Sequence, residues 1–212
     1  MAKRFKIVQP KIPPSLTKED FIIEEEPSLS TCLISDCTIG GEDINRLIFD
    51  QVFFRNVIFE EVLFRNVELT DVIFDHCDLS NVDFSGGIIH RVEFKECKML
   101  GSNLSETTFG NVIFTNCHGD LSSFGFAKLK QVKFENCSLN NSDFYECDFQ
   151  KVEFEGCKLD DTNFSNTSLK GMDLSSCSFE QLIVSLEEIE GCEVSPEQAI
   201  GFSKLLGLVI KE

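Results

Sequence analysis

The chain has 212 residues, a formal net charge of −17, and 21 Phe against one Tyr and no Trp. Its length and its unbroken internal repeat predict a single domain. The strong negative charge argues against direct nucleic-acid binding, and no apolar run approaches the ~20 residues that a membrane span needs.

The first segment, residues 1–27, is expected to cap the repeat that follows it. It begins with basic residues that no apolar stretch follows, so no signal peptide is predicted and a cytoplasmic location is expected. The sequence PKIPP at 10–14 is incompatible with a helix throughout the segment. Leu16, Phe21, Ile22 and Ile23 supply apolar side chains that can shield the open edge of the first coil.

An apolar residue recurs at every fifth position from Ile34 to Ile189, and only Gly119 breaks the series. A period of five fits neither the helix, with 3.6 residues per turn, nor the strand, with a period of 2. Residue types also repeat every twenty positions, so four short segments make one turn of a solenoid. We therefore predict an all-β solenoid over residues 28–191, square in cross-section, with about eight 20-residue coils and a height of roughly 38 Å.

The residue two positions before each apolar centre also points inward, and these residues form four columns that define four faces. The valine face contains Val52, Val72, Val92, Val112, Val132 and Val152; the cysteine face, Cys77, Cys97, Cys117, Cys137, Cys157 and Cys177; the hydroxyl face, Ser102, Ser122, Ser142 and Thr162; and the mixed face, Thr107, Ala127, Cys147 and Thr167. Like residues are expected to pack on like residues one coil away. The centres of the valine face predict a phenylalanine ladder made of Phe54, Phe74, Phe94, Phe114, Phe134 and Phe154.

The ten cysteines are interpreted as small buried thiols of a reduced protein, because their even spacing follows the coil. The sequence has neither CxxC-like pairs nor Cys/His clusters, so no zinc site is predicted, and no cofactor is expected. His76, His90 and His118 fall at outward positions and are interpreted as surface residues.

The negative charge belongs to the repeat itself. Residues 28–190 contain 28 acidic and 12 basic residues, a net charge of −16. This is one net charge per ~2.4 Å of axis, against one per ~1.7 Å in duplex DNA. The acidic residues that we select as a candidate docking surface are Glu60, Glu61, Asp78, Asp120, Asp160, Asp161 and Glu180 on the cysteine face, and Glu93, Glu96, Glu135, Glu153 and Glu155 on the valine face. The alternative interpretation is that the charge serves solubility alone.

Several outward positions in the N-terminal coils are apolar. They are Ile48, Phe53, Ile58, Leu63, Ile73, Ile88 and Ile113. A patch of this size indicates either a covering segment, which residues 1–27 can supply, or a docking surface for a partner.

The last segment, residues 192–212, has a different pattern. Ser195, Pro196 and Glu197 predict the start of a helix, with Ser as the N-cap and Pro in the first turn. A short strand is expected at residues 208–210. The apolar side chains of Ile200, Phe202, Leu205, Leu206, Leu208 and Ile210 are expected both to cap the last coil and to mediate dimerisation.

The repeat units CDLSNVDFSGG, CKLDDTNFSN and CSLNNSDFYE resemble those of pentapeptide-repeat proteins, and the tail VSPEQAIGFSKLLGLVI resembles that of the Qnr-type quinolone-resistance proteins. The resemblance implies a right-handed quadrilateral β-helix that dimerises through its C-terminus. It also implies an acidic DNA mimic that binds DNA gyrase and topoisomerase IV and protects them from fluoroquinolones. Many Qnr proteins carry two projecting loops, which this chain lacks. In the same comparison Gly119 corresponds to a break between two blocks of coils, or alternatively to a narrowed coil.

Three other functions are alternatives to the one that the resemblance implies. A structural or regulatory scaffold would dock a different protein partner through the apolar patch near Phe53 and Ile73. An enzyme is not expected, because the sequence has no phosphate-binding loop and no nucleophile–base constellation. A small-ligand sequestration role would require a pocket at one end of the rod.

Overall fold

The structure, a computed structural model, describes residues 5–23, 27–207 and 209, apart from the side chains of residues 204 and 206. Its strands are β1 (Thr17–Lys18), β2 (Ser28–Ser30), β3 (Cys32–Gly40), β4 (Ile48–Asp50), β5 (Phe53–Glu60), β6 (Glu68–Asp75), β7 (Ile88–Lys95), β8 (Thr108–Thr115), β9 (Lys128–Glu135), β10 (Asp148–Glu155), β11 (Thr162–Asn163) and β12 (Leu182–Ile183). The helix α1 (Pro196–Phe202) and the 3-10 helix η1 (Ser203–Leu206) follow them.

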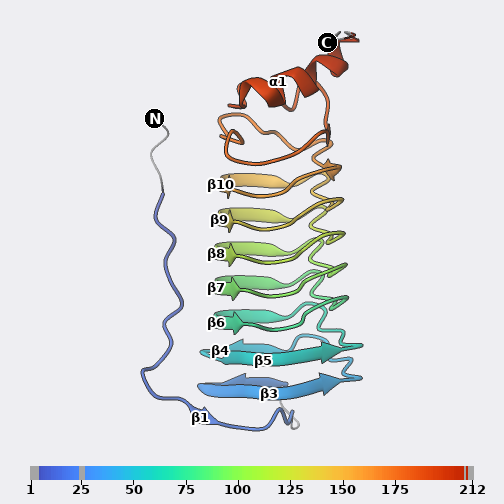
Figure 1. Ribbon diagram of the computed structural model, residues 1–212. Coiled ribbons are helices and arrows are strands. Elements are labelled where there is room, and N and C mark those ends of the chain that lie inside the picture. The colour runs from blue at the N-terminus through green and yellow to red at the C-terminus, as the bar shows by residue number, and fades with distance from the viewer. Residues whose placement is uncertain (1–4, 24–26, 208, 210–212) are drawn as a thin grey trace.

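The strands stack in parallel with a register of twenty residues, as the sequence predicts (Figure 1). Val92 pairs with Val72 on one side and Val112 on the other. Strands β6 to β10 each cover the mixed and valine faces, whereas single bridges such as Asp78–Lys98 and Asp83–Asn103 join the coils on the other two faces. The predicted right-handed quadrilateral β-helix of about eight coils is confirmed.

The square cross-section depends on a left-handed residue at each corner. Among the described residues, 24 non-glycine residues have φ between 52° and 63°, and most of them lie five positions apart. Asn is frequent at these corners, and Gly86, Gly101 and Gly156 occupy equivalent positions. Both residue types tolerate positive φ better than branched or bulky side chains. The residue types at the corners therefore favour the turns of the coil, and those of the inward columns favour its packed core.

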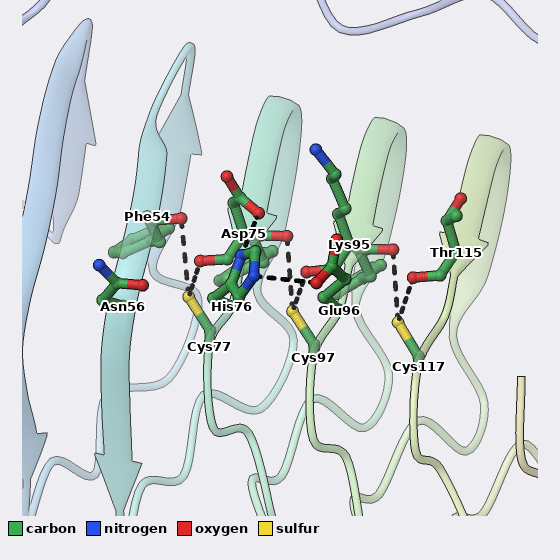
Figure 2. Close-up of polar contacts among 12 residues, drawn as sticks. Phe54, Asn56, Asp75, His76, Cys77, Lys95, Glu96, Cys97, Thr115 and Cys117 are labelled. Atoms are coloured by element: carbon green, nitrogen blue, oxygen red, sulfur yellow. Dashed lines mark hydrogen bonds and ion pairs between the residues drawn. The ribbon is translucent and has the colours of Figure 1, made fainter.

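The core contains the predicted phenylalanine ladder. Neighbouring rings from Phe54 to Phe154 lie 4.7–5.0 Å apart, with interplanar angles of 2–6°. All ten cysteines are free thiols, as predicted, and eight are buried. In the cysteine column each Sγ from Cys77 to Cys157 lies near two carbonyls: Cys97 Sγ, for example, donates to Phe74 O and to Lys95 O, both at 3.4 Å (Figure 2). These contacts give the buried thiols partners without any disulfide.

The predicted coil break at Gly119 is wrong. The backbone ladder continues through this position, because Gly119 N–H donates to Ser138 O at 2.8 Å and His118 bridges to Lys98 and Ser138. Leu139 fills the space left by the missing side chain, and a Cβ on Gly119 would lie 3.1 Å from Leu139 Cδ2. Two serine hydroxyls, Ser122 Oγ and Ser142 Oγ, donate to Gly119 O at 2.6 and 2.9 Å. The glycine is thus a locally compensated core position.

The N-terminal segment covers the first coil. Strand β1 pairs with the start of β3, with Thr17 opposite Cys32. The ring of Phe21 lies 6.3 Å from that of Phe49 and 6.1 Å from that of Phe64. This end of the core is therefore closed by backbone pairing and by an aromatic side chain.

The preceding residues 5–14, which we call the arm, run back along the side of the stack (Figure 1). The sequence did not predict this path. The arm follows the corner between the mixed and valine faces through four hydrogen bonds: Gln51 Nε2 to Lys11 O (3.1 Å), Lys11 N–H to Asp71 Oδ1 (2.9 Å), Val8 N–H to Asn111 Oδ1 (3.0 Å) and Gln131 Nε2 to Lys6 O (3.1 Å). It therefore spans five successive coils.

The C-terminal helix begins as predicted. The Ser195 side chain accepts from Gln198 N–H, and the Gln198 side chain accepts from Ser195 N–H at 2.7 Å. Gln198 is buried, and its Nε2 donates to Leu174 O (2.9 Å) and Cys177 O (2.8 Å). The helix is thereby fixed across the end of the last coil (Figure 1). Leu208 and Ile210 of the expected strand lie outside the described residues.

Candidate partner-binding surface

The twelve selected carboxylates all retain contact with solvent. Glu60, Glu61, Glu96 and Glu180 are exposed, and the other eight are half-buried. They lie on the valine and cysteine faces, which meet at one edge of the rod. The in-register stacking places those that share a column a whole number of coils apart, one for Glu135 and Glu155 and three for Glu93 and Glu153. The structure thus brings the predicted residues onto two adjoining faces of one continuous surface.

Some of these carboxylates also hold the coils together. Asp120 Oδ1 accepts from Ser138 Oγ (2.7 Å) and Asn140 N–H (2.8 Å), and Asp160 Oδ1 accepts from Glu180 N–H. Asp161 accepts from Gln181 Nε2. Substitution of these aspartates would perturb backbone contacts as well as charge. The exposed glutamates are therefore the better residues for testing an electrostatic role.

Histidine and lysine side chains bridge carboxylates of neighbouring coils. His76 lies between Asp75 and Glu96, with Nδ1 2.7 Å from Asp75 Oδ1 and Nε2 2.9 Å from Glu96 Oε2 (Figure 2). Lys133 contacts Glu135 and Glu155. The Lys133 ammonium reduces the local negative charge at one point, and both faces keep an overall excess of acidic residues.

Glu93 has the most unusual environment of the selected acids. It stands in register between Ile73 and Ile113, and burial raises its pKa, partly offset by Lys95. His90, expected at the surface, is half-buried on the mixed face, and burial lowers its pKa. The surface assignment of His90 is thus corrected.

Glu60 and Glu61 border a surface hollow of about 630 Å³. Gly40 and Gly41 form part of its wall, and Ile58, 45% exposed, contributes an apolar side chain. Asp78 lies on the same hollow. A hollow whose wall combines one exposed apolar side chain with acidic residues is suited to a partner side chain that is both long and cationic.

The arm changes which edge of the rod a partner can reach. Residues 1–18 contain five basic residues and no acidic ones, in a chain whose net charge is −17. The described part of this segment lies on the corner between the mixed and valine faces. Two basic residues, Lys128 and Lys130, line a hollow of about 500 Å³ on the mixed face. The opposite edge of the valine face, where it meets the cysteine face, is therefore the accessible acidic edge.

The predicted apolar patch is smaller than expected. Phe53, Leu63, Ile73 and Ile113 are half-buried, whereas Ile48, Ile58 and Ile88 are exposed. The arm forms hydrogen bonds at Gln51 and Asp71, two residues before Phe53 and Ile73. The Arg55 guanidinium also lies 6.0 Å from the centre of the Phe53 ring.

The C-terminal end presents part of the predicted dimerisation set. Ile200 is 56% exposed and Leu205 is 37% exposed. Phe202 is half-buried and packs on Phe179, with ring centroids 5.7 Å apart. The Leu206 side chain, Leu208 and Ile210 lie outside the described residues. The visible part of this end thus combines a capping aromatic residue with exposed aliphatic ones.

Comparison with known proteins identifies the repeat. A family model described as "Pentapeptide repeat region" matches residues 67–144, 87–164 and 127–195, which together exceed half of the chain. The chain belongs to the pentapeptide-repeat family. The uncharacterized protein YisX of Bacillus subtilis (strain 168) is 57% identical over 206 residues, covering 96% of this chain and 97% of YisX.

A solved pentapeptide-repeat protein shares the fold. HetL, a protein involved in heterocyst differentiation regulation in the cyanobacterium Nostoc sp. strain PCC 7120, matches with a TM-score of 0.54 and 15% identity, covering 84% of this chain and 86% of HetL. A trypsin-treated variant of QnrB1, a plasmid-mediated fluoroquinolone resistance protein, matches with a TM-score of 0.43 and 18% identity, covering 87% of this chain and 92% of QnrB1.

Two exposed corner residues of this pentapeptide-repeat protein were missed in the sequence. Leu121 and Phe126 have φ of 63° and 62° and are 61% and 53% exposed. They are the only apolar residues among the described non-glycine residues with positive φ. The signal was available in the repeat, because the same position elsewhere carries mainly Asn, acidic or other polar residues.

Among the described residues, no group of three or more His, Cys, Asp or Glu side chains is arranged to hold a metal ion. Within the same part of the chain, the helices are too short or too polar to span a membrane.

Proposed function

We propose that this pentapeptide-repeat protein is an acidic, DNA-mimicking rod that binds type II topoisomerases, DNA gyrase or topoisomerase IV, and modulates or protects them from fluoroquinolones. The observation that carries the proposal is the continuous acidic surface of the valine and cysteine faces, whose twelve selected carboxylates all reach solvent. A surface with regularly spaced negative charge can occupy a basic groove that normally receives DNA. The resemblance of residues 194–210 to a Qnr tail supports the same partner.

The geometry favours one edge of the rod for docking. The valine and cysteine faces meet at the corner that contains His76 and Glu96, and the width of the valine face separates this corner from the one that the arm follows. The coil lacks inserted loops, because every coil from β6 to β10 keeps the twenty-residue register. A straight rod without projections can lie along an extended groove over several coils.

The proposed rod is a homodimer joined through its C-terminal ends. The exposed side chains of Ile200 and Leu205 support this arrangement, because aliphatic residues at the end of a solenoid are normally covered. Two rods of roughly 38 Å would give a dimer roughly 75–80 Å long, at ~4.8 Å per coil.

Leu205→Asp is expected to convert the dimer to a monomer. The new carboxylate would have to be buried between two acidic rods, which opposes association. Light scattering coupled to gel filtration should show a fall from twice 23.9 kDa to 23.9 kDa. Ile88→Asp, which alters an exposed aliphatic residue on the mixed face, should leave the mass of the dimer unchanged. A wild-type protein that is monomeric at micromolar concentration would contradict the dimer.

Neutralising exposed glutamates on the cysteine face is expected to weaken topoisomerase binding about tenfold, because each exposed ion pair contributes at most ~1 kcal/mol. The variant Glu60→Gln/Glu61→Gln/Glu180→Gln removes three charges, and these side chains make no ion pair with any other described residue. Affinity for gyrase should be measured at two salt concentrations, since screening should reduce the difference.

The matched control is Asp50→Asn/Glu68→Gln/Asp148→Asn, which removes the same charge from exposed positions of the mixed face. Equal weakening by both variants would show that net charge, rather than the selected faces, determines binding. Unchanged affinity in the cysteine-face variant would contradict the DNA-mimic mechanism.

A further inference from the structure

The corner column between the hydroxyl and mixed faces carries an exposed aromatic residue between two acids. Glu106, Phe126 and Glu146 occupy equivalent corners of three successive coils, with φ of 59°, 62° and 53°. Backbone hydrogen bonds fix this stacking: Glu106 N–H donates to Gly125 O (2.9 Å) and Phe126 N–H donates to Tyr145 O (2.8 Å). All three side chains are exposed, and Phe126 is 53% exposed.

The position is unfavourable for a phenylalanine in the isolated protein. A bulky side chain at positive φ is an outlier, and the same corner in other coils carries Asn66, Gly86 or Asn166. Phe126 lies outside the core and its ring is exposed, although the Tyr145 ring packs against it with centroids 5.4 Å apart. The contact with Tyr145 leaves more than half of Phe126 exposed at a strained position, and a strained, exposed residue of this kind indicates a role in binding.

The chemistry of the neighbours defines the partner. Among the described residues neither Glu106 nor Glu146 forms an ion pair, and two coils separate them by roughly 10 Å. We propose that Phe126 is a docking point for an arginine side chain of the protein partner. The guanidinium of this arginine stacks on the Phe126 ring and forms ion pairs with Glu106 and Glu146. Arginine fits this site because its planar cation binds both aromatic faces and carboxylates. Phosphate groups of a nucleic acid would be repelled by the same carboxylates.

This inference rests on the proposed function. It adds a contact at the hydroxyl–mixed corner, diagonally opposite the valine–cysteine edge, and therefore requires a partner groove that reaches around the rod. The test is Phe126→Asn in the full-length protein, with affinity measured for the purified gyrase of Bacillus subtilis, the organism of the YisX relative. Asn accepts positive φ, so the variant should fold and its melting temperature should rise by ~2–4 °C. Binding should nevertheless weaken about thirtyfold, the effect of losing a buried aromatic anchor.

Leu121→Asn is the matched control, because Leu121 is an equally strained, exposed apolar corner of the same coil, with Gly101 and Asn141 as its neighbours in the column. This variant should show the same rise in melting temperature. Leu121 shares its corner column with Glu61 and Asp161, so the variant controls for stability and not for binding. The variant Glu106→Gln/Glu146→Gln should weaken binding about tenfold at low salt and less at high salt.

The outcomes separate this inference from the proposed function. Wild-type protein that fails to bind gyrase or topoisomerase IV would overturn both. Wild-type binding that Phe126→Asn leaves unchanged would overturn only the docking point. Unchanged affinity of Glu106→Gln/Glu146→Gln at low salt would overturn the role of the carboxylates. Self-association that Phe126→Asn abolishes, with gyrase binding intact, would also overturn the docking point.

Discussion

Phe114→Ala is expected to lower the free energy of unfolding by about 3–5 kcal/mol, the usual cost of deleting a buried phenylalanine ring. Phe114 is 2% exposed and stacks on Phe94 and Phe134, with centroids 4.7 Å away on both sides. It also contacts the edge of Phe124 at 6.1 Å. Each coil is packed only against its neighbours, so a cavity in the middle of the ladder cannot be filled from another part of the protein.

Urea denaturation followed by circular dichroism measures this loss. Ile88→Ala, at a position 53% exposed, is the control and should change stability by less than about 0.5 kcal/mol. A loss below about 1 kcal/mol for Phe114→Ala would mean that neighbouring coils relax into the cavity. The stacked ladder would then not be the main source of cohesion along the rod.

Asp71→Ala is expected to release the arm and to lower the free energy of unfolding by about 2–3 kcal/mol. Asp71 is 4% exposed and accepts from Arg91 Nε and Nη2, both at 2.6 Å, and from Lys11 N–H at 2.9 Å. Its removal leaves the partly buried Arg91 guanidinium unpaired and removes one of the four hydrogen bonds of the arm. Cleavage by trypsin after Lys6 and Lys11 should become at least about tenfold faster, because the released arm is open to the protease.

Asp71→Asn is the informative control, because its amide oxygen can still accept from Lys11 N–H but carries no charge for Arg91. It should give intermediate cleavage. The hydrogen bonds from Arg91 hold the pKa of Asp71 below its usual range. A lowered folded-state pKa means that this contribution is complete above the ordinary Asp pKa of about 4 and is lost as pH falls through the folded value. Cleavage of Asp71→Ala at the wild-type rate would contradict the anchoring role.

The core and the number of coils could be predicted from the sequence because each buried position recurs in every coil with a similar residue type. A five-residue period with columns of Phe and Cys leaves one arrangement in which like residues stack, and the structure has it. The start of α1 could also be predicted, since Ser195 and Pro196 act through local backbone chemistry. Gly119 was misjudged because Leu139 and the Ser142 hydroxyl, which compensate for the missing side chain together with the nearby Ser122 hydroxyl, come from the next coil.

The path of the arm could not be predicted in the same way. An extended segment carries no periodic signal, and its contacts with Asn111 and Gln131 join residues more than 100 positions apart. One indication was present in the repeat. Asp71 and Arg91 are opposite charges separated by one coil, which places them side by side in a twenty-residue register. The twenty-residue spacing thus predicts the ion pair between Asp71 and Arg91. It does not predict that Asp71 also accepts a hydrogen bond from Lys11 N–H of the arm.

The most direct test of the proposed function is a supercoiling assay in which the protein is titrated into DNA gyrase, and in parallel into topoisomerase IV, with and without a fluoroquinolone. We predict that the wild-type protein restores supercoiling in the presence of the drug, and that Glu60→Gln/Glu61→Gln/Glu180→Gln requires a higher concentration to do so. Inhibition without rescue would support competition with DNA but not protection. No effect on either enzyme at micromolar protein would contradict the proposal that this acidic rod acts on type II topoisomerases.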